Sequence, residues 1–257
     1  MVASRISLKV LSPLPLTKRE DGKMIFDLWQ KYLPNLLPDK FGNWEPIDRT
    51  FDPAHIETAL DAWKWPFLTL RTKPSVDASI WMRKGARQRL HSSWGFDLDV
   101  EAASQTELVT FLKAASVALK ADFGYIHLLT PSELERGRIS KMVHALDKRA
   151  TKFNFSIYSK DLQQRIPDLL WATVLGSPYA QMFARSSLLT APAYISQSLP
   201  NESFLLQMTE KLSDVEQHPD VFNEVRSRVK AHLGKEAFFQ PHHLAANDYR
   251  VPQFIFD

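Results

Sequence analysis

The sequence predicts an α+β fold, with mixed or antiparallel sheets and helices packed on one face. Two kinds of periodicity lead to this prediction. Residues 5–11 alternate between apolar and polar side chains, which is typical of a strand with one buried face. Segments 17–33, 104–119 and 219–233 instead carry apolar residues at helical spacing. Both patterns recur along the chain, so strands and helices are expected in both of its halves.

Residues 1–130 are predicted to follow the order β-α-α-β-β-β-α-β. The first helix begins with a capping box formed by Thr17 and Glu20, and the second begins at Asp52 before Pro53. The last helix of this half begins with a second capping box, led by Ser104. The predicted strands span residues 5–11, 66–71, 79–83, 90–100 and 124–129.

Residues 131–168 have the polar composition of a connector, with one candidate strand at 153–158. Residues 169–257 are predicted to follow the order β-α-β-β-α. Their strands span 169–175, 194–197 and 204–208, and their clearest helix runs from Pro219 to a stop at Gly234. The shared β-α-β-β…α order suggests two pseudo-related, split-βαβ-like halves in one compact unit.

Composition narrows the class of protein. Hydrophobic residues make up 44% of the chain and charged residues 24%, as in ordinary globular proteins. The absence of cysteine excludes disulfides, thiolate metal sites and a cysteine nucleophile. No apolar run reaches the roughly 18 residues that cross a bilayer, and residues 1–8 lack the apolar core of a signal peptide. We therefore expect a cytoplasmic protein without a membrane partner.

The sequence contains no recognised catalytic signature, so it predicts no enzyme, cofactor or metal site. Gly176-Ser177-Pro178 lies between a predicted strand and a helix, but the pattern of a nucleophile elbow is missing and Pro178 lacks a backbone N–H. There is no P-loop, dinucleotide fingerprint or zinc-binding histidine motif, and the adjacent pair His242 and His243 favours a polar loop. His127, in an apolar strand, is interpreted as a core residue.

Two acidic residues leave a metal alternative open. Asp97 and Asp99 alternate with apolar residues, so both carboxylates are predicted to lie on one face of a strand. Such a pair can bind Mg²⁺ or share a proton. The solvated face of an antiparallel strand is the simpler interpretation.

A basic cluster supports an alternative function. Arg83, Lys84, Arg87 and Arg89 fall at a predicted hairpin tip between Trp81 and Trp94. Cations beside aromatic rings can hold phosphates and stack on bases. The alternative is therefore a nucleic-acid-binding or metal-dependent nuclease-like protein using residues 83–89. A solvated turn is the more ordinary interpretation, and the near-balanced net charge of +3 does not favour nucleic acid.

Tryptophans are candidate interface anchors, because this residue is enriched at binding hot spots. Most of Trp44, Trp63, Trp65 and Trp171 are expected in the core. Trp44 is the exception, because residues 41–46 form an aperiodic loop containing Gly42 and Pro46. A large aromatic side chain there either caps the core or contacts a partner.

Five segments of the chain have a recognisable sequence pattern. They are Leu-Leu-Trp-Ala-Thr-Val-Leu-Gly-Ser-Pro-Tyr at 169–179, Leu-Leu-Thr-Ala-Pro-Ala-Tyr at 188–194, Arg-Val-Lys-Ala-His-Leu-Gly at 228–234 with Phe238 and Phe239, Tyr-Arg-Val-Pro-Gln-Phe at 249–254, and Leu-Pro-Asp-Lys-Phe-Gly-Asn-Trp-Glu-Pro at 37–46. These segments resemble a family of bacterial polymorphic-toxin immunity proteins, the family called immunity protein 52.

The resemblance implies a cytoplasmic protein that neutralises one cognate toxin by direct binding, without cofactor or catalytic residues. It transfers no interface positions, so the candidate partner-binding residues come from the patterns above. They are Trp44, Trp81, Arg83, Lys84, Arg87, Arg89, Asp97 and Asp99. The identity of the toxin and the existence of a homodimer are left open.

Overall fold

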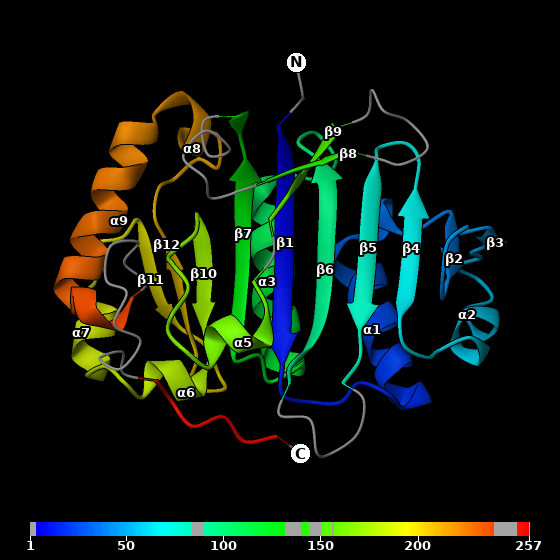
Figure 1. Cartoon of the computed structure of the whole chain (residues 1–257), viewed down its shortest axis with the longest axis horizontal. Helices are drawn as coiled ribbons and strands as arrows, with labels where there is room; N and C mark the ends of the chain where they lie inside the picture. The colour runs from blue at the N-terminus through cyan, green and yellow to red at the C-terminus, as the bar shows by residue number, and fades with distance from the viewer. Residues whose placement is uncertain are drawn as a thin grey trace.

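A ten-stranded antiparallel sheet organises the chain (Figure 1). The computed structural model describes residues 4–83, 90–131, 140–143, 151–155, 157–238 and 251–256. The strand order is β11-β12-β10-β7-β1-β6-β5-β4-β2-β3, and β8 pairs with β9 separately. The predicted α+β class is confirmed, and every strand pair in the main sheet is antiparallel.

The strands are β1 (Arg5–Ser12), β2 (Lys40–Gly42), β3 (Arg49–Thr50), β4 (Phe67–Arg71), β5 (Val76–Trp81), β6 (Ser92–Asp99), β7 (Phe123–Leu129), β8 (Ser140–Val143), β9 (Thr151–Asn154), β10 (Ala172–Leu175), β11 (Ile195–Ser198) and β12 (Phe204–Gln207). The α-helices are α1 (Arg19–Tyr32), α2 (Glu57–Asp61), α3 (Gln105–Ala118), α5 (Ser159–Leu162), α6 (Ser177–Ala180), α7 (Arg185–Leu189), α8 (Asp214–Gln217) and α9 (Pro219–Leu233). Short 3₁₀ helices span Pro34–Leu36 and Lys235–Ala237.

Strand β1 lies inside the sheet, between two strands that come much later in the chain. It pairs with β6 and with β7. Strand β7 also pairs with β10, so a single sheet continues from the first half of the sequence into the second. Because neighbours are antiparallel, β1, β2, β5 and β10 end, and β4, β6 and β7 begin, at one end of the sheet, which we call the lower end (Figure 1).

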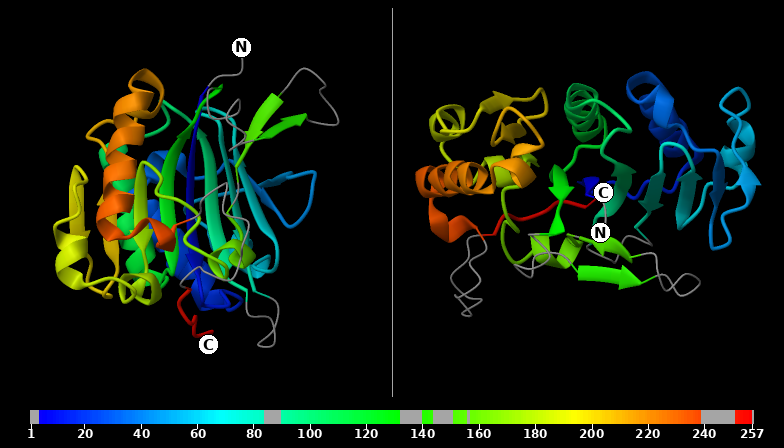
Figure 2. Two further views of the ribbon diagram at one scale, coloured as in Figure 1. Left: turned by 60° about the vertical axis from the view of Figure 1, so that its left-hand side comes forward. Right: turned by 90° about the horizontal axis from the view of Figure 1, so that it is seen from above.

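Helices α1 and α3 cover one face of the sheet, and an aromatic core lies beneath them (Figure 2). The ring of Trp29 on α1 contacts Phe96 on β6 at 5.0 Å. Phe111 on α3 contacts Trp94 on β6 at 4.9 Å. All four aromatic side chains are buried. Large apolar groups of this kind supply most of the area that the fold removes from water.

The opposite face is covered around β1 and β7 by α5, α9 and the segment before α5 (Figure 2). Tyr125 and His127 of β7 contact Phe155 and Phe222 there, at 5.5 and 5.8 Å. His127 is buried and its Nδ1 accepts the backbone N–H of Trp171 at 3.2 Å, so its interpretation as a core histidine is confirmed. No helix in the described part of the chain is long and apolar enough to cross a bilayer.

Three predicted helix termini are confirmed. The side chain of Ser104 accepts the backbone N–H of Glu107 at 3.2 Å, which closes the capping box before α3. Helix α9 begins at Pro219 and stops at Gly234, whose φ of 103° is a conformation that L side chains rarely adopt. The predicted hairpin of the second half is confirmed by the pairing of β11 with β12.

Two other helix starts were predicted wrongly. Helix α1 is capped by Lys18 rather than Thr17, because the carboxylate of Asp21 accepts the Lys18 backbone N–H at 2.8 Å. The carboxylate of Asp52 instead accepts the N–H of Ala54 at 2.9 Å, which closes a turn. Helix α2 then begins only at Glu57. At α1 the reciprocal side-chain bond comes from Asp21 instead of Glu20, one residue further along the chain, and at Asp52 the side-chain bond closes a turn before any helix begins.

Gly176 marks a close approach of backbones at the lower end. A Cβ atom at this position would lie 2.2 Å from the carbonyl oxygen of Ala121. The Gly176 N–H donates to the carbonyl of Asp122 at 3.0 Å. Only glycine allows this contact, which brings the start of α6 beside the start of β7.

Replacing Gly176 with alanine should therefore lower the free energy of unfolding by about 1–3 kcal/mol, because the backbones must separate. Gly95→Ala is the matched control, since its Cβ would meet nothing closer than 3.5 Å. Urea denaturation of both variants measures the difference. Equal stability of the two variants would contradict the close approach at Gly176.

Lys9 anchors the segment before α5 to the sheet. Its Nζ donates to the carbonyl of Ile157 at 3.3 Å and lies 5.5 Å from the ring centre of Tyr158. Burial lowers the pKa of Lys9 from 10.5 to about 8, although the charge of Asp161 acts in the opposite direction. The folded chain therefore releases this proton at a lower pH than the unfolded chain does.

Between about pH 8 and 10.5 the unfolded state binds more protons at Lys9, so the contribution of this residue to stability rises with pH in that window. Lys9→Met removes the titrating group and keeps an apolar chain. Wild type should gain about 2 kcal/mol relative to Lys9→Met between pH 7 and 10. Chemical denaturation across this range tests the prediction, and parallel stability curves would refute it.

Candidate partner-binding surface

Three tryptophan side chains form a row at the lower end of the sheet. The rings of Trp44 and Trp65 are 5.5 Å apart, and those of Trp65 and Trp81 are 5.7 Å apart, both in edge-to-face geometry. Trp44 is 61% exposed and Trp81 is 42% exposed, while Trp65 between them is half-buried. We call these three residues the tryptophan row.

The row results from the antiparallel order of three strands. Trp44 follows the end of β2, Trp65 precedes the start of β4, and Trp81 is the last residue of β5. In the register, Gly42 faces Leu68 and Phe67 faces Ile80. Residues that are 37 positions apart in the sequence therefore meet at one edge, near the lower right of the sheet in Figure 1.

Asn43 holds the row in place. Its side chain is buried, and Nδ2 lies 3.2, 3.1 and 2.8 Å from the carbonyl oxygens of Ala62, Lys64 and Pro66. These contacts join the loop that carries Trp44 to the segment that carries Trp65. A rigid arrangement lowers the entropy that must be lost when a partner binds.

A small pocket lies beside Trp44. It has a volume of about 250 Å³ and is lined by Gly42, Asn43, Trp44, Pro46, Asp48, Arg49 and Lys64. This volume is below the usual range of roughly 300–1,000 Å³ for small-molecule sites. The lining charges have both signs. The pocket therefore has the size and polarity to receive one side chain of a protein partner.

Asp97 and Asp99 lie on one face of β6, as predicted, but the partly buried Arg5 neutralises them. Arg5 Nε contacts Asp97 Oδ1, and its Nη1 donates to Asp99 Oδ1 at 2.6 Å. A third guanidinium nitrogen donates to the backbone carbonyl of Asp97 at 2.9 Å. The guanidinium thus occupies the position that a shared cation would take. Local spacing could not reveal this, because Arg5 reaches the pair only through the β1–β6 register.

Arg83 is the only member of the basic cluster among the described residues, and it does not belong to a surface patch. Arg83 is only 3% exposed; its Nη2 donates to the carbonyl of Pro13 at 3.3 Å, and its guanidinium lies 5.6 Å from the ring of Phe256. It therefore packs inside the lower end, which corrects its expected place at an exposed hairpin tip. Lys84, Arg87 and Arg89 lie outside the described residues, as do His242 and His243.

The other flagged tryptophans behave as core residues. Trp171 is fully buried, and Trp63 packs against Phe67 at 5.0 Å and donates through Nε1 to the carbonyl of Leu16 at 3.0 Å. Trp65 was expected in the core, like Trp63, but it is half-buried and belongs to the tryptophan row. The local sequence Trp63-Lys64-Trp65 does not distinguish the buried tryptophan from the partly exposed one. Among the described residues, no group of three or more His, Asp or Glu side chains is placed to hold a metal ion.

In comparisons with protein-family models and with curated proteins, nothing matches this chain. The functional inference therefore depends on the residues and geometry of the chain itself.

Loss of the Asn43 side chain should separate the two loops that carry the row. Asn43→Ala is expected to reduce the free energy of unfolding by about 1–3 kcal/mol, because the carbonyls of Ala62, Lys64 and Pro66 lose their side-chain donor. Asn35→Ala, at an exposed position, should change it by less than about 0.5 kcal/mol. Thermal unfolding of the two variants provides the test, and indistinguishable midpoints would show that Asn43 does not hold the row.

Proposed function

We propose that this chain is an immunity-type protein of the cytoplasm that neutralises a cognate bacterial toxin by binding it directly. The observation that supports the proposal most strongly is the exposed, rigidly held tryptophan row. The likeness of several segments to toxin-immunity proteins supplies the class of partner. The proposed binding surface is the row together with the pocket beside Trp44.

The energetics of tryptophan favour a protein partner. An aromatic side chain of this size contributes on the order of 150–250 Å² of contact area, and truncating a hot-spot tryptophan costs about 2 kcal/mol or more. Trp44 is 61% exposed, so a large apolar surface stays in contact with water in the isolated chain. Burial against a partner would remove this surface from water.

The sheet face next to the row extends the proposed surface. Leu68 and Leu70 on β4, and Ser79 on β5, lie on the same face as Trp81 and are half-buried. Their neighbours in sequence point into the core under α1. This face and the row together offer area for an interface of the standard size, about 800 Å² per partner.

The charge distribution supports a protein partner over a nucleic acid. The chain has 32 basic and 29 acidic residues, and the pocket beside Trp44 combines Asp48 with Arg49 and Lys64. A nucleic-acid interface concentrates positive charge on one face. The inward direction of Arg83 removes one member of the cluster on which the nucleic-acid alternative depended.

A growth-rescue assay tests the immunity role. The reading frame adjacent to this gene is expressed from a tight promoter, with and without this chain. The proposal predicts toxicity that only co-expression of this chain relieves, and a complex that co-purifies. Toxicity that persists in the presence of the chain, or the absence of any toxicity, would count against the immunity role.

The tryptophan row should dominate the affinity. Trp44→Ala and Trp81→Ala are each expected to weaken binding of the co-purified toxin by roughly 30-fold, because each removes an interface anchor. Their thermal midpoints should stay close to wild type, since both side chains are exposed. Isothermal titration calorimetry measures the affinities.

Tyr194→Ala is the matched control for this series. Tyr194 is also a large exposed side chain, 54% accessible, but it precedes β11 at the far edge and the opposite end of the sheet. The Tyr194→Ala variant should bind the toxin with the affinity of the wild-type chain. The surface assignment is wrong if Tyr194→Ala loses affinity while both tryptophan variants keep it.

A further inference from the structure

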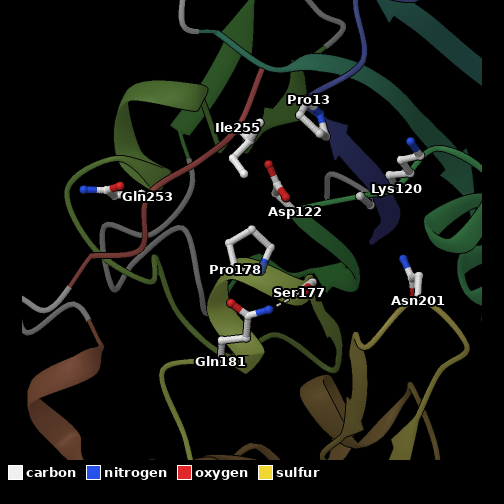
Figure 3. Close-up of a pocket in the computed structure, with 10 residues that line it drawn as sticks. Pro13, Lys120, Asp122, Ser177, Pro178, Gln181, Asn201, Gln253 and Ile255 are labelled. Atoms are coloured by element: carbon white, nitrogen blue, oxygen red, sulfur yellow. Dashed lines mark hydrogen bonds between the residues drawn. The ribbon is translucent and has the colours of Figure 1, made fainter. Parts of the chain in front are cut away.

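A second pocket opens at the lower end of the sheet, closer to its centre (Figure 3). Its volume is about 380 Å³. Its walls come from the end of β1, the start of β7, helix α6, the β11–β12 turn and residues 251–256. The residues that matter here are Pro13, Asp122, Pro178, Gln181, Asn201 and Ile255.

The carboxylate of Asp122 is the most deeply placed polar group in this pocket. The residue is 4% exposed, and Figure 3 shows its carboxylate among the labelled side chains that surround the pocket. Its Oδ2 lies 2.9 Å from His91 Nε2. None of the described residues donates a hydrogen bond to Oδ1. Asp122 lines the pocket, so Oδ1 is the carboxylate oxygen that can accept a hydrogen bond from whatever occupies it.

The contacts of His91 indicate which oxygen of Asp122 faces the pocket. Ser159 Oγ accepts the His91 backbone N–H at 2.9 Å and lies 2.6 Å from Nδ1. The hydroxyl can therefore donate its own hydrogen to Nδ1, so that Nε2 carries the ring hydrogen and donates to Asp122. In this arrangement His91 occupies Oδ2 of Asp122, and the other carboxylate oxygen is left facing the pocket.

The same contacts argue against a serine hydrolase. The three side chains resemble a catalytic triad, but Ser159 is buried and does not line the pocket, while the carboxylate does. The rings of Phe254 and Phe256 lie 4.9 and 5.0 Å from His91 and cover it. His91 and Ser159 are therefore positioning residues for Asp122.

The pocket wall is otherwise suited to an apolar chain. Pro13, Pro178 and Ile255 present hydrocarbon surface, and Gln181 and Asn201 also line the pocket (Figure 3). Lys120 also lines the pocket, but it is exposed and forms no ion pair with Asp122. Burial raises the pKa of Asp122, and the hydrogen bond from His91 acts against this effect. A bound cation would act in the same direction as His91.

We propose that this pocket binds an organic cation, namely an ammonium or guanidinium group on a short apolar chain, with Asp122 as its counter-ion. The group pairs with Asp122 Oδ1, and the chain lies along Pro13, Pro178 and Ile255. This chemistry is shared by free small amines and by a lysine or arginine side chain of a polypeptide. The site is separate from the tryptophan row and does not depend on the immunity role.

The test titrates the purified chain alone with n-butylguanidine and with n-butylurea, its neutral analogue of nearly the same shape, followed by amide NMR shifts. We expect n-butylguanidine to bind with a millimolar dissociation constant and to shift residues around Asp122. The urea should bind at least tenfold more weakly. Equal binding of the two probes, or no binding of either, would overturn the proposal without needing any variant.

Asp122→Asn provides the second arm, because asparagine has the same size and can still accept from His91. It should lose at least tenfold in affinity for n-butylguanidine; unchanged affinity in the folded variant would overturn the proposal. A third arm compares the affinity of the peptide acetyl-Gly-Arg-Gly-amide with that of n-butylguanidine. Tighter binding of this peptide than of n-butylguanidine identifies a polypeptide side chain as the source of the cation, and weaker binding identifies a free small molecule.

Discussion

The pairing of β1 between β6 and β7 is the constraint on which the rest of the structure depends. It joins the first strand of the chain to strands about 90 and 120 positions later, with Arg5 opposite both Asp99 and Leu129. The same register places Arg5 against Asp97 and Asp99 and aligns the lower ends of β1, β6 and β7. Through β7 and β10 it also connects the two halves of the sequence in one sheet. Contacts so distant in sequence are slow to form and costly in chain entropy, so the aromatic core under α1 and α3 must stabilise them.

Both proposed sites lie at the lower end of this sheet because antiparallel order brings alternate strand ends together. The tryptophan row uses the ends of β2, β4 and β5, and the Asp122 pocket uses those of β1, β7 and β10. Arg83 and His91, which lie between the two sites, both contact the ring of Phe256. The exposed Val100 and Tyr194 lie at the upper end, where no row of contacting aromatic rings is found among the described residues. A sheet of rigid strands holds loop residues in fixed positions, which is the arrangement that binding sites require.

Much of the local structure could be predicted from the sequence, whereas the sites could be predicted only in part. Periodicity identified β1 and the three long helices, and the aromatic and β-branched composition of residues 66–71 and 124–129 identified β4 and β7. The position of β1 inside the sheet could not be predicted, because strand order depends on contacts that leave no local pattern. Trp44 was singled out from its aperiodic loop, and it is exposed. Its contact with Trp65, the pairing of Arg5 with two aspartates, and the Asp122–His91–Ser159 cluster all depend on register and remained outside the reach of spacing arguments.

The central claim is that the tryptophan row is the surface that a protein partner covers. Hydrogen–deuterium exchange of the chain, alone and with the proposed toxin partner, tests this claim most directly. The account predicts slower exchange on complex formation in residues 43–46, 63–66 and 79–82, which surround the row. Protection confined to α9 or β11, with unchanged exchange in those three segments, would contradict it.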